Sequence, residues 1–366
     1  MDIVTLDIIG AVLNSLKYTN IEKYKMLKKR VILTKKLVDL IKDESSFTVT
    51  TAAMLKDIGD MKSPDIKHVS NYASAELIRV MPEIIPLQYE IADIILDSNE
   101  KIDGTGFYKK SDISIESQIV AIIDEFLLTN KIPETGYDNI VIKGLKKIID
   151  IDYIKVMLNK TDYIDNLFDH ILKKNNVYKI KLDSVEEEQF LSVIASIIDS
   201  GHEYTGGHTK RVATYSYVLG KELGYDKEKL SEIRYAAYLH DIGKLVIDVN
   251  ILDKPDKLDN YEFEKIKAHA LYSYKILQDS PQLKNISYGA LHHERLDGKG
   301  YPFGLSAKDI PQETRIITFA DILDALTSNR PYRKPLTFKK ALEIMENTMV
   351  GKSIDPEIFE IAKFLF

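Results

Sequence analysis

The sequence predicts an all-α protein built from two tandem copies of one helical domain. In segments such as 193–198 and 316–326, apolar residues recur with gaps of one, three and four, as expected for amphipathic helices. Strict alternation over the length of a strand is rare, and Gly and Pro cluster between the periodic segments. Several blocks of the first half also recur in the same order in the second half. Short strands are conceivable only near 177–182.

Composition bounds the class of protein. A chain of 366 residues with 45% hydrophobic and 29% charged residues is typical of two globular domains. The absence of cysteine excludes disulfides and thiol catalysis and is compatible with a reducing cytoplasm. The net charge of -6 argues against a DNA- or RNA-binding protein. Residues 1–4 are a poor signal peptide, and no stretch approaches 18 apolar residues. We therefore expect a cytoplasmic protein without a membrane span.

The repeated blocks define the domains. A helix carries Arg30-Val31 in the first copy and Arg211-Val212 in the second. The further matches, in chain order, are 52–60 with 236–244, 98–108 with 292–302, 112–124 with 309–321 and 151–154 with 354–357. Matches in one order are hard to obtain by chance. We therefore predict domains over 1–160 and 184–366, joined by a linker over 161–183 that contains the polar run 173–176.

One eleven-residue segment occurs in both copies but has its two histidines only in the second copy. Residues 292–302 read His-His-Glu-Arg-Leu-Asp-Gly-Lys-Gly-Tyr-Pro, whereas residues 98–108 read Ser-Asn-Glu-Lys-Ile-Asp-Gly-Thr-Gly-Phe-Tyr. The glutamate and the Gly-rich turn are kept, and both imidazoles are lost. Imidazole pairs bind metals, whereas serine and asparagine do so poorly. The sequence therefore predicts one metal site and one copy that has lost it.

The other histidines of the second copy are also missing from the first. Lys56 takes the place of His240, a leucine near Leu27 takes that of His208, and His68 is out of register with His269 by one or two residues. The candidate metal ligands are His208, His240, Asp241, His269, His292, His293 and Asp321. Five imidazoles and two carboxylates are about what a dinuclear site needs. The alternative, a scatter of unrelated polar residues, does not explain why the imidazoles disappear together.

These motifs resemble a known family. Residues 185–366 resemble the HD-GYP family of HD-superfamily phosphohydrolases, and residues 1–160 resemble a degenerate copy of it. The resemblance rests on the runs 240–244 (His-Asp-Ile-Gly-Lys), 292–294 (His-His-Glu), 300–302 (Gly-Tyr-Pro) and 321–333. The resemblance implies helical bundles of the HD type and a binuclear metal centre. It also implies hydrolysis of the bacterial second messenger cyclic di-GMP to linear pGpG, with GMP as a further product left open. Iron is the favoured metal, and manganese and zinc are the alternatives.

The resemblance also assigns roles to individual residues. It makes the seven candidate ligands metal ligands, with Asp241 bridging two metals, and places Lys244 near the scissile phosphate. Arg330 and Arg333 match basic positions that reach substrate phosphates. Alternatively, Lys244 is a solvated lysine at a helix end, and Arg330 and Arg333 have an ordinary surface role.

The expected chemistry suits these residue types. Two metals would screen a phosphodiester and lower the pKa of a bridging water, whose hydroxide would attack phosphorus. Lys244 would stabilise charge on the phosphoryl or departing oxygen. Gly300, Tyr301 and Pro302 would shape the pocket wall, with Tyr301 stacking on a guanine, or would serve only as a rigid turn.

A third metal is not expected. Some family members bind one with a glutamate four residues before the position of His208, where this chain has Tyr204. The neighbouring Glu203 would point elsewhere if the helix extends that far, because one residue turns a helix by about 100°. We therefore predict two divalent metals.

Several alternatives stay open. A cyclic GMP-AMP phosphodiesterase is the second choice, and hydrolysis of another nucleotide phosphate is the third. A sensor that binds a cyclic dinucleotide without hydrolysing it belongs to a different class of function. The first copy is expected to bind no metal and to act in packing, dimerisation or regulation, which leaves open a homodimer formed through the N-terminal domain.

Overall fold

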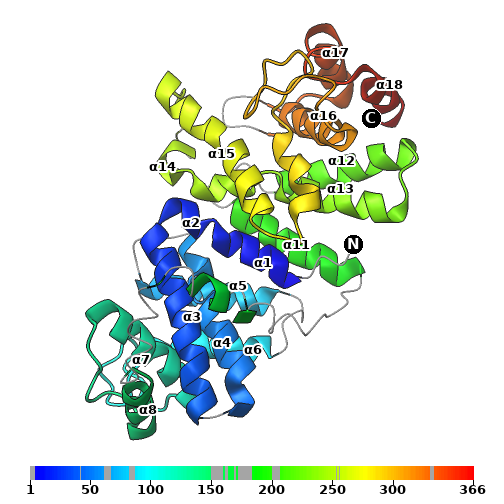
Figure 1. Ribbon diagram of the computed structural model, residues 1–366. Helices are drawn as coiled ribbons and strands as arrows, with labels where there is room; N and C mark the ends of the chain where they lie inside the picture. The colour runs from blue at the N-terminus through cyan, green and yellow to red at the C-terminus, as the bar shows by residue number, and fades with distance from the viewer. Residues whose placement is uncertain are drawn as a thin grey trace. The chain divides into compact units, whose positions relative to one another are not determined.

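The computed structural model describes residues 5–41, 43–61, 67–81, 87–149, 160, 164–168, 170–171, 184–199, 207–252, 254, 256–329 and 334–366 (Figure 1). Every regular element within these ranges is a helix, and pairing between extended segments there is limited to two isolated bridges. The all-α prediction is confirmed. Residues 177–182, the one segment in which a short strand was conceivable, and the polar run 173–176 lie outside the described residues.

The chain forms two compact units, each described here by itself. The N-terminal unit is Asn20–Phe190, and the C-terminal unit combines Met1–Thr19 with Leu191–Phe366. The α-helices of the N-terminal unit are α3 (Ile21–Ile41), α4 (Ser46–Leu55), α5 (Lys67–Val80), α6 (Gln88–Asp97), α7 (Ile115–Thr129) and α8 (Asn139–Ile149), and its 3-10 helices are η1 (Asp43–Ser45) and η2 (Ile58–Met61).

The C-terminal unit contains most of the remaining elements. Its helices are α1 (Thr5–Asn14), α2 (Leu16–Thr19), α12 (His208–Glu222), α13 (Lys227–Leu239), α14 (Val249–Leu252), α15 (Asn260–Gln278), α16 (Gln312–Thr327), α17 (Phe338–Thr348) and α18 (Pro356–Leu365), with the 3-10 helices η3 (Ile242–Val246) and η4 (Lys284–Leu291). Helix α11 (Ser184–Ile198) begins in the N-terminal unit and continues into the C-terminal one.

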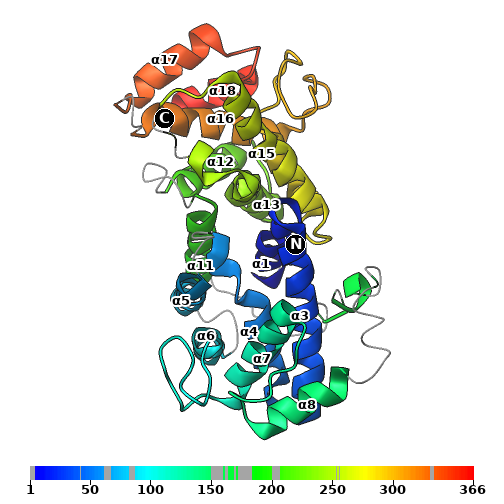
Figure 2. The ribbon, with the colours of Figure 1, turned by 90° about the vertical axis from the view of Figure 1, so that its left-hand side faces the viewer.

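The two units repeat one arrangement of helices. Helix α3 packs against α4 and α7, and α12 packs in the same way against α13 and α16 (Figure 2). A further link is made twice, because Ser74 Oγ accepts the backbone N–H of Gly59 at 2.8 Å and Ser273 Oγ accepts that of Gly243 at 2.8 Å. Counting back four residues from each serine places Ser70 opposite His269. The matched serine bonds therefore support the register of the sequence repeat.

Short polar residues determine where several helices begin. Asp226 accepts the backbone N–H of Lys229 and caps α13, and Asp355 caps α18, whose first residue is a proline. Asp259 and Glu262 form a capping box at the start of α15. Such caps satisfy backbone donors that the first helical turn leaves free and contribute about 1 kcal/mol each.

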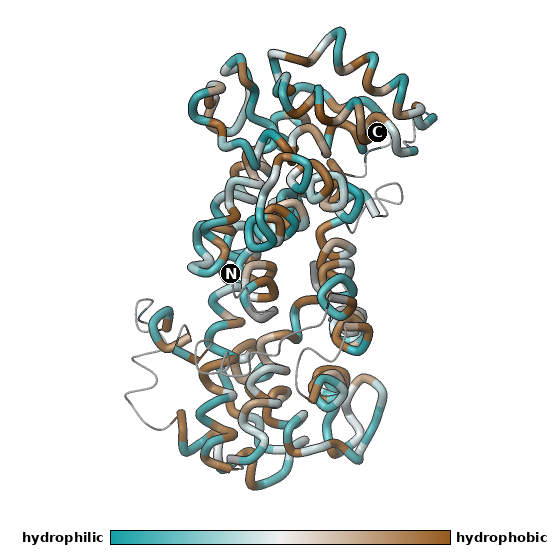
Figure 3. The backbone as a smooth tube through the Cα atoms, turned by 90° about the vertical axis from the view of Figure 1, so that its right-hand side faces the viewer, coloured by the Kyte–Doolittle hydropathy of each residue, from teal (hydrophilic) through white to brown (hydrophobic). Residues whose placement is uncertain are grey.

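An apolar core holds the C-terminal unit together. Polar and apolar residues are interspersed along its helices (Figure 3). The buried apolar residues of several helices form one cluster. Ile316, Phe319 and Leu323 of α16 pack with Leu219 of α12 and Phe359 of α18, and all five are buried. Burial of each such side chain contributes roughly 1.5–3 kcal/mol. This packing fixes α16, which carries Asp321.

The first nineteen residues belong to the C-terminal unit. Lys17 Nζ and the Tyr18 hydroxyl lie 2.6 and 2.8 Å from Oδ2 of Asp279, which follows α15, and the rings of Tyr18 and Tyr272 lie 5.6 Å apart. The compact units therefore assign residues 1–19 and 184–190 differently from the predicted domains, whose limits stay a prediction. Contacts across 262 residues of sequence leave no periodic signal that could have predicted this. No described helix is long and apolar enough to cross a membrane.

Candidate metal centre

The candidate ligands come from the ends and inner faces of separate helices. His208 is the first residue of α12, His240 and Asp241 lie between α13 and η3, and His292 follows η4. His269 and Asp321 lie within α15 and α16. Since α13 ends at Leu239, the two residues after it leave the helix and project into the same buried space. The structure brings together residues that are separated by up to about a third of the chain.

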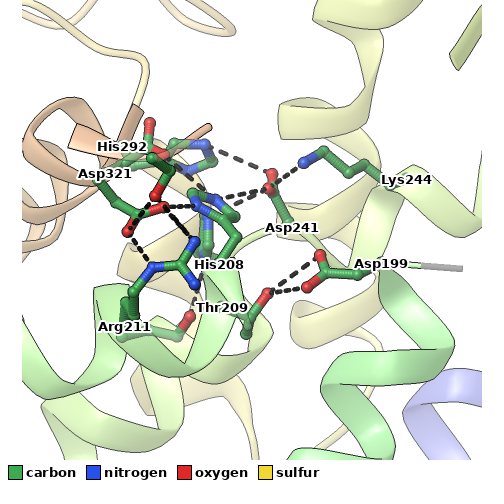
Figure 4. A network of polar contacts seen from close by, with 12 residues as sticks. Asp199, His208, Thr209, Arg211, Asp241, Lys244, His292 and Asp321 are labelled. Carbon is green, nitrogen blue, oxygen red and sulfur yellow. Dashed lines mark hydrogen bonds and ion pairs between the residues drawn. The ribbon is translucent and has the colours of Figure 1, made fainter. Parts of the chain in front are cut away.

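Asp241 lies at the centre of the cluster, with Lys244 on one side and His208 and His292 on the other (Figure 4). Its Oδ2 lies 3.1 Å from His240 Nε2 and 4.0 Å from His208 Nε2. Its Oδ1 lies 3.1 Å from His269 Nε2 and 3.6 Å from His292 Nε2. Each carboxylate oxygen therefore faces a different pair of imidazoles, as a carboxylate shared by two cations would.

Among the residues that the structure describes, two groups of side chains have a geometry that suits a metal ion. His208, His240 and Asp241 form one group, and His269, His292 and His293 form the other. Within each group the donor atoms lie within 4.8 Å of one another. Asp321 joins the first group, because its Oδ1 lies 3.4 Å from His208 Nε2.

Hydrogen bonds orient the imidazoles toward the centre. In His240, His269 and His292, Nδ1 lies 2.6, 2.6 and 3.0 Å from the carbonyl oxygen three residues earlier. In His208, Nδ1 lies 2.7 Å from Asp324 Oδ2. Carbonyl and carboxylate oxygens only accept, so each Nδ1 donates its proton and Nε2 is the atom left to face the centre, as in metal-binding histidines.

Buried polar atoms without a hydrogen bond indicate that these residues fit a metal. Nε2 of His240, Nε2 of His269 and Oδ1 of Asp241 are buried and form no hydrogen bond within the described residues, although each of the two imidazoles lies 3.1 Å from an Asp241 oxygen. An unsatisfied buried polar atom costs about 1–3 kcal/mol. A divalent cation in contact with these lone pairs would remove that cost, so the donor set fits a metal held by nitrogen and oxygen.

Charges in the cluster also favour cation binding. Burial lowers the pKa of His292 and His293 well below the usual range, and the neighbouring histidines add to this effect. Both rings are therefore neutral, which is the form that binds metals. Burial would raise the pKa of Asp241, but His240 and Lys244 outweigh it and hold that pKa well below its usual range. Burial would lower the pKa of His240, but Asp241 raises it to about 9, so a metal there displaces a proton.

Lys244 belongs to the same cluster. Its Nζ lies 2.5 Å from Asp241 Oδ2, and only 16% of its side chain is exposed. Burial would lower the pKa of Lys244, but Asp241 and Asp199 outweigh burial and raise it. The lysine is thus a buried cation beside the central carboxylate rather than a solvated residue at a helix end.

The Gly-rich turn is built around a buried glutamate. Glu294 Oε1 accepts the backbone N–H groups of Phe303 at 2.6 Å and Gly304 at 3.2 Å, and Oε2 accepts that of Leu305 at 2.8 Å. A Cβ at Gly300 would lie 2.5 Å from the Cα of Glu294, which explains the glycine. The sequence pattern did not reveal this role, although the retained glutamate in both copies was a signal for it.

Two other predicted contacts with substrate involve Tyr301 and the arginines. The Tyr301 ring stacks on His293 at 4.7 Å between centroids, with Lys267 Nζ 5.2 Å from the Tyr301 centroid. The aromatic ring therefore borders the second group of histidines, and stacking on a guanine stays a prediction. Arg330, Arg333 and Tyr204, on which the phosphate contacts and the third metal depend, lie outside the described residues.

The matching place in the N-terminal unit holds protein cations instead of imidazoles. Arg30 pairs with Asp57 at 2.7 Å and with Asp124, and Lys56 Nζ lies 2.6 Å from Asp124 Oδ2. All four residues are buried. Burial would raise the pKa of Asp124, but the two cations lower it to about 2. Two positive and two negative charges therefore balance where the C-terminal unit gathers its histidines.

Known proteins are similar to this chain. Residues 192–358 match the model of the HD domain family. A cyclic di-GMP phosphodiesterase of Thermotoga maritima is 32% identical over 288 residues, which cover 74% of this chain and 76% of that protein. The chain belongs to the HD-GYP family. A 3'3'-cGAMP-specific phosphodiesterase 3 of Vibrio cholerae is 43% identical to this HD-GYP protein over 185 residues, but the chain spans only 40% of that relative's length.

A solved structure extends the likeness to both units. The crystal structure of a cyclic GMP-AMP-specific phosphodiesterase of Vibrio cholerae superimposes with a TM-score of 0.62. The match covers 97% of this HD-GYP chain and 95% of the other chain, at 22% identity. At that identity the likeness establishes the fold alone.

Proposed function

We propose that the chain is a metal-dependent phosphodiesterase that hydrolyses a cyclic dinucleotide. The observation that carries the proposal is the Asp241 carboxylate, whose two oxygens face different groups of imidazoles. Such a site suits a pair of divalent ions, with iron favoured and manganese and zinc as alternatives. The leading substrate is cyclic di-GMP, cleaved to linear pGpG, with GMP as a further product left open. The Thermotoga maritima relative supports this substrate.

Individual residues of the chain have separate roles in the proposed reaction. Two bound divalent ions would screen the phosphodiester and activate a water. Lys244, beside Asp241, would place its ammonium near the phosphoryl or departing oxygen and stabilise the charge that develops there. The turn formed by Gly300, Tyr301 and Pro302 would border the bound base. Arg330 and Arg333 are proposed to contact the second phosphate.

A specific observation favours a second candidate. A 3'3'-cGAMP-specific phosphodiesterase is 43% identical over 185 residues, whereas the cyclic di-GMP phosphodiesterase is 32% identical over the longer stretch of 288 residues. Both dinucleotides offer two phosphodiesters to the same metals and differ in one base. Side chains around Tyr301 are therefore proposed to set the preference between cyclic di-GMP and the hybrid.

Hydrolysis by the full chain tests the proposal. Anaerobically metal-loaded protein is incubated with cyclic di-GMP, 3'3'-cGAMP or a nucleoside triphosphate, and products are separated by chromatography. We expect cleavage of a cyclic dinucleotide, abolished in His292→Asn. Hydrolysis of the triphosphate alone would overturn the proposal. Metal-loaded protein that binds a cyclic dinucleotide without cleaving it would identify a sensor instead.

We further propose that the N-terminal unit acts in packing, dimerisation or regulation. Its buried pairs between Arg30, Lys56 and two aspartates already balance the carboxylates that a metal would need. Light scattering of the full chain would reveal a homodimer, and loss of that dimer on substituting the exposed surface of this unit would locate the contact there.

A further inference from the structure

We infer that Asp324 is a positioning residue that aims His208 at the metal centre and keeps Arg211 away from the metal-binding carboxylates. Asp324 lies on α16, three residues after Asp321, and is fully buried. It binds His208 on one side and Arg211 on the other. The inference rests on the proposed function, because it concerns the same metals.

The contact with His208 replaces one that the other histidines obtain from the backbone. His240, His269 and His292 each direct Nδ1 at the carbonyl oxygen three residues earlier. His208 is the first residue of α12, so no preceding turn of that helix offers such a carbonyl. Oδ2 of Asp324 accepts from Nδ1 at 2.7 Å instead, which leaves Nε2 of His208 free to bind a metal.

The contact between Asp324 and Arg211 pairs a cation that lies one helical turn from His208. Arg211 lies one turn after His208 on the same face of α12. Its Nε lies 2.5 Å from Asp324 Oδ1 and its Nη2 lies 3.2 Å from Oδ2, and Nη2 also lies 2.9 Å from Ser328 Oγ. A guanidinium that is already engaged in two directions does not turn toward Asp321, so that carboxylate is left for a metal.

The N-terminal unit shows where the matched arginine goes when this carboxylate is missing. Arg30 corresponds to Arg211, and its guanidinium pairs with Asp57 and Asp124. These two residues are the counterparts of the central aspartate and of the α16 ligand in the C-terminal unit. The arginine therefore occupies the oxygens that a metal would use.

The same comparison shows that two residues are lost together. Leu27 stands where the C-terminal unit has His208, and Leu127, three residues after Asp124, stands where it has Asp324. An imidazole without its carboxylate partner, or a buried carboxylate without its imidazole, would leave an unsatisfied group. The joint replacement is what a pair with one shared task predicts.

Metal affinity of the full chain tests the inference without any substrate. Asp324→Asn keeps the shape but cannot neutralise Arg211, so we expect the metal dissociation constant to rise about 10–100-fold, as for other partners of metal-binding histidines. Adding Arg211→Met to Asp324→Asn should tighten metal binding again, because the competing guanidinium is gone. Competition with a chelator of known affinity, elemental analysis and the melting temperature with and without metal are the measurements.

Asp355→Asn is the matched control. It weakens another Arg–Asp pair of α16, that of Arg315 with Asp355 at 2.7 Å, and asparagine still caps α18. We expect wild-type metal affinity in this variant. Wild-type affinity in folded Asp324→Asn would overturn the inference, and no recovery in the double variant would overturn its part about Arg211. Wild-type protein that binds metal but cleaves no cyclic dinucleotide would refute the proposed function and leave this result standing.

Discussion

At the scale of single residues, the site is organised around one carboxylate that serves several partners. Oδ2 of Asp241 lies 2.5 Å from Lys244 Nζ and 3.1 Å from His240 Nε2, so the lysine and the first imidazole group share one oxygen. A cation held by that group would take over part of the negative charge that now holds Lys244. The ammonium would then be available to a substrate phosphate at the same place.

Replacing Lys244 separates this role from metal binding. In Lys244→Met we expect kcat to fall about 10²–10³-fold, the usual loss when one preorganised donor to a developing charge is removed. Metal content should stay at the wild-type value, because the lysine is not a ligand. Lys254→Met, which breaks an ion pair with Glu262 at the start of α15, should leave both quantities unchanged. Full activity, or loss of metal, in Lys244→Met would contradict this assignment.

The clustering of the histidines was predictable from sequence, but the residues that orient them were not. The degenerate copy loses every imidazole and keeps its aspartates, and this contrast singles out His208, His240, His269, His292 and His293 without any structure. The partner of His208 lies 116 residues away, on a helix whose rotation depends on core packing. Periodicity predicts which face of a helix is buried, but not which buried side chain meets which.

At the scale of elements, the Gly-rich turn forms in both units, although only the C-terminal unit has paired histidines in front of it. Glu100 accepts the backbone N–H groups of Tyr108 at 2.7 Å and Lys110 at 3.1 Å, as Glu294 does for its own turn. A Cβ at Gly106 would lie 2.6 Å from the Cα of Glu100. The glutamate and glycine of the eleven-residue segment are therefore explained by the shape of the turn, and its histidines by the metal centre.

Matched substitutions in the two turns separate stability from catalysis. Glu100→Gln and Glu294→Gln each replace an acceptor of backbone N–H groups by an amide with one acceptor oxygen. Each should lower the free energy of unfolding by about 1–3 kcal/mol, the cost of an unsatisfied buried group. Only Glu294→Gln should also raise KM, because its turn carries Tyr301. Thermal unfolding and steady-state kinetics are the measurements, and an equal rise of KM in both variants would refute the division.

The helical class was predictable, whereas the assignment of the first helices to a unit was not. The apolar period and the Gly and Pro positions predicted helices over 193–198 and 316–326, and α11 and α16 occupy these residues. The assignment of α1 and α2 to the C-terminal unit depends on Lys17 and Tyr18 meeting Asp279. Such a contact between distant segments has no counterpart in the local pattern.

At the scale of the whole molecule, duplication has produced two sites that neutralise their aspartates by different means. In the N-terminal unit, Arg30 and Lys56 pair with Asp57 and Asp124. In the C-terminal unit, Lys244 and His240 face one oxygen of Asp241, and His269 faces the other. A buried carboxylate needs a cation in either case. The N-terminal unit obtains that charge from its own side chains, so we expect its structure not to require a metal.

Counting metals in the full chain tests this division of labour. We expect two divalent ions per wild-type chain, and none in the double variant His240→Asn with His292→Asn, which removes a ligand from each group of the C-terminal unit. No residual metal is expected, because Arg30 and Lys56 already occupy the carboxylates of the other unit. His170→Asn, at an exposed position, should keep both ions. Elemental analysis of anaerobically purified protein gives the count, and anomalous diffraction gives the positions. A stoichiometric ion beside Asp57 and Asp124 in the double variant would show that protein cations do not replace the metal there.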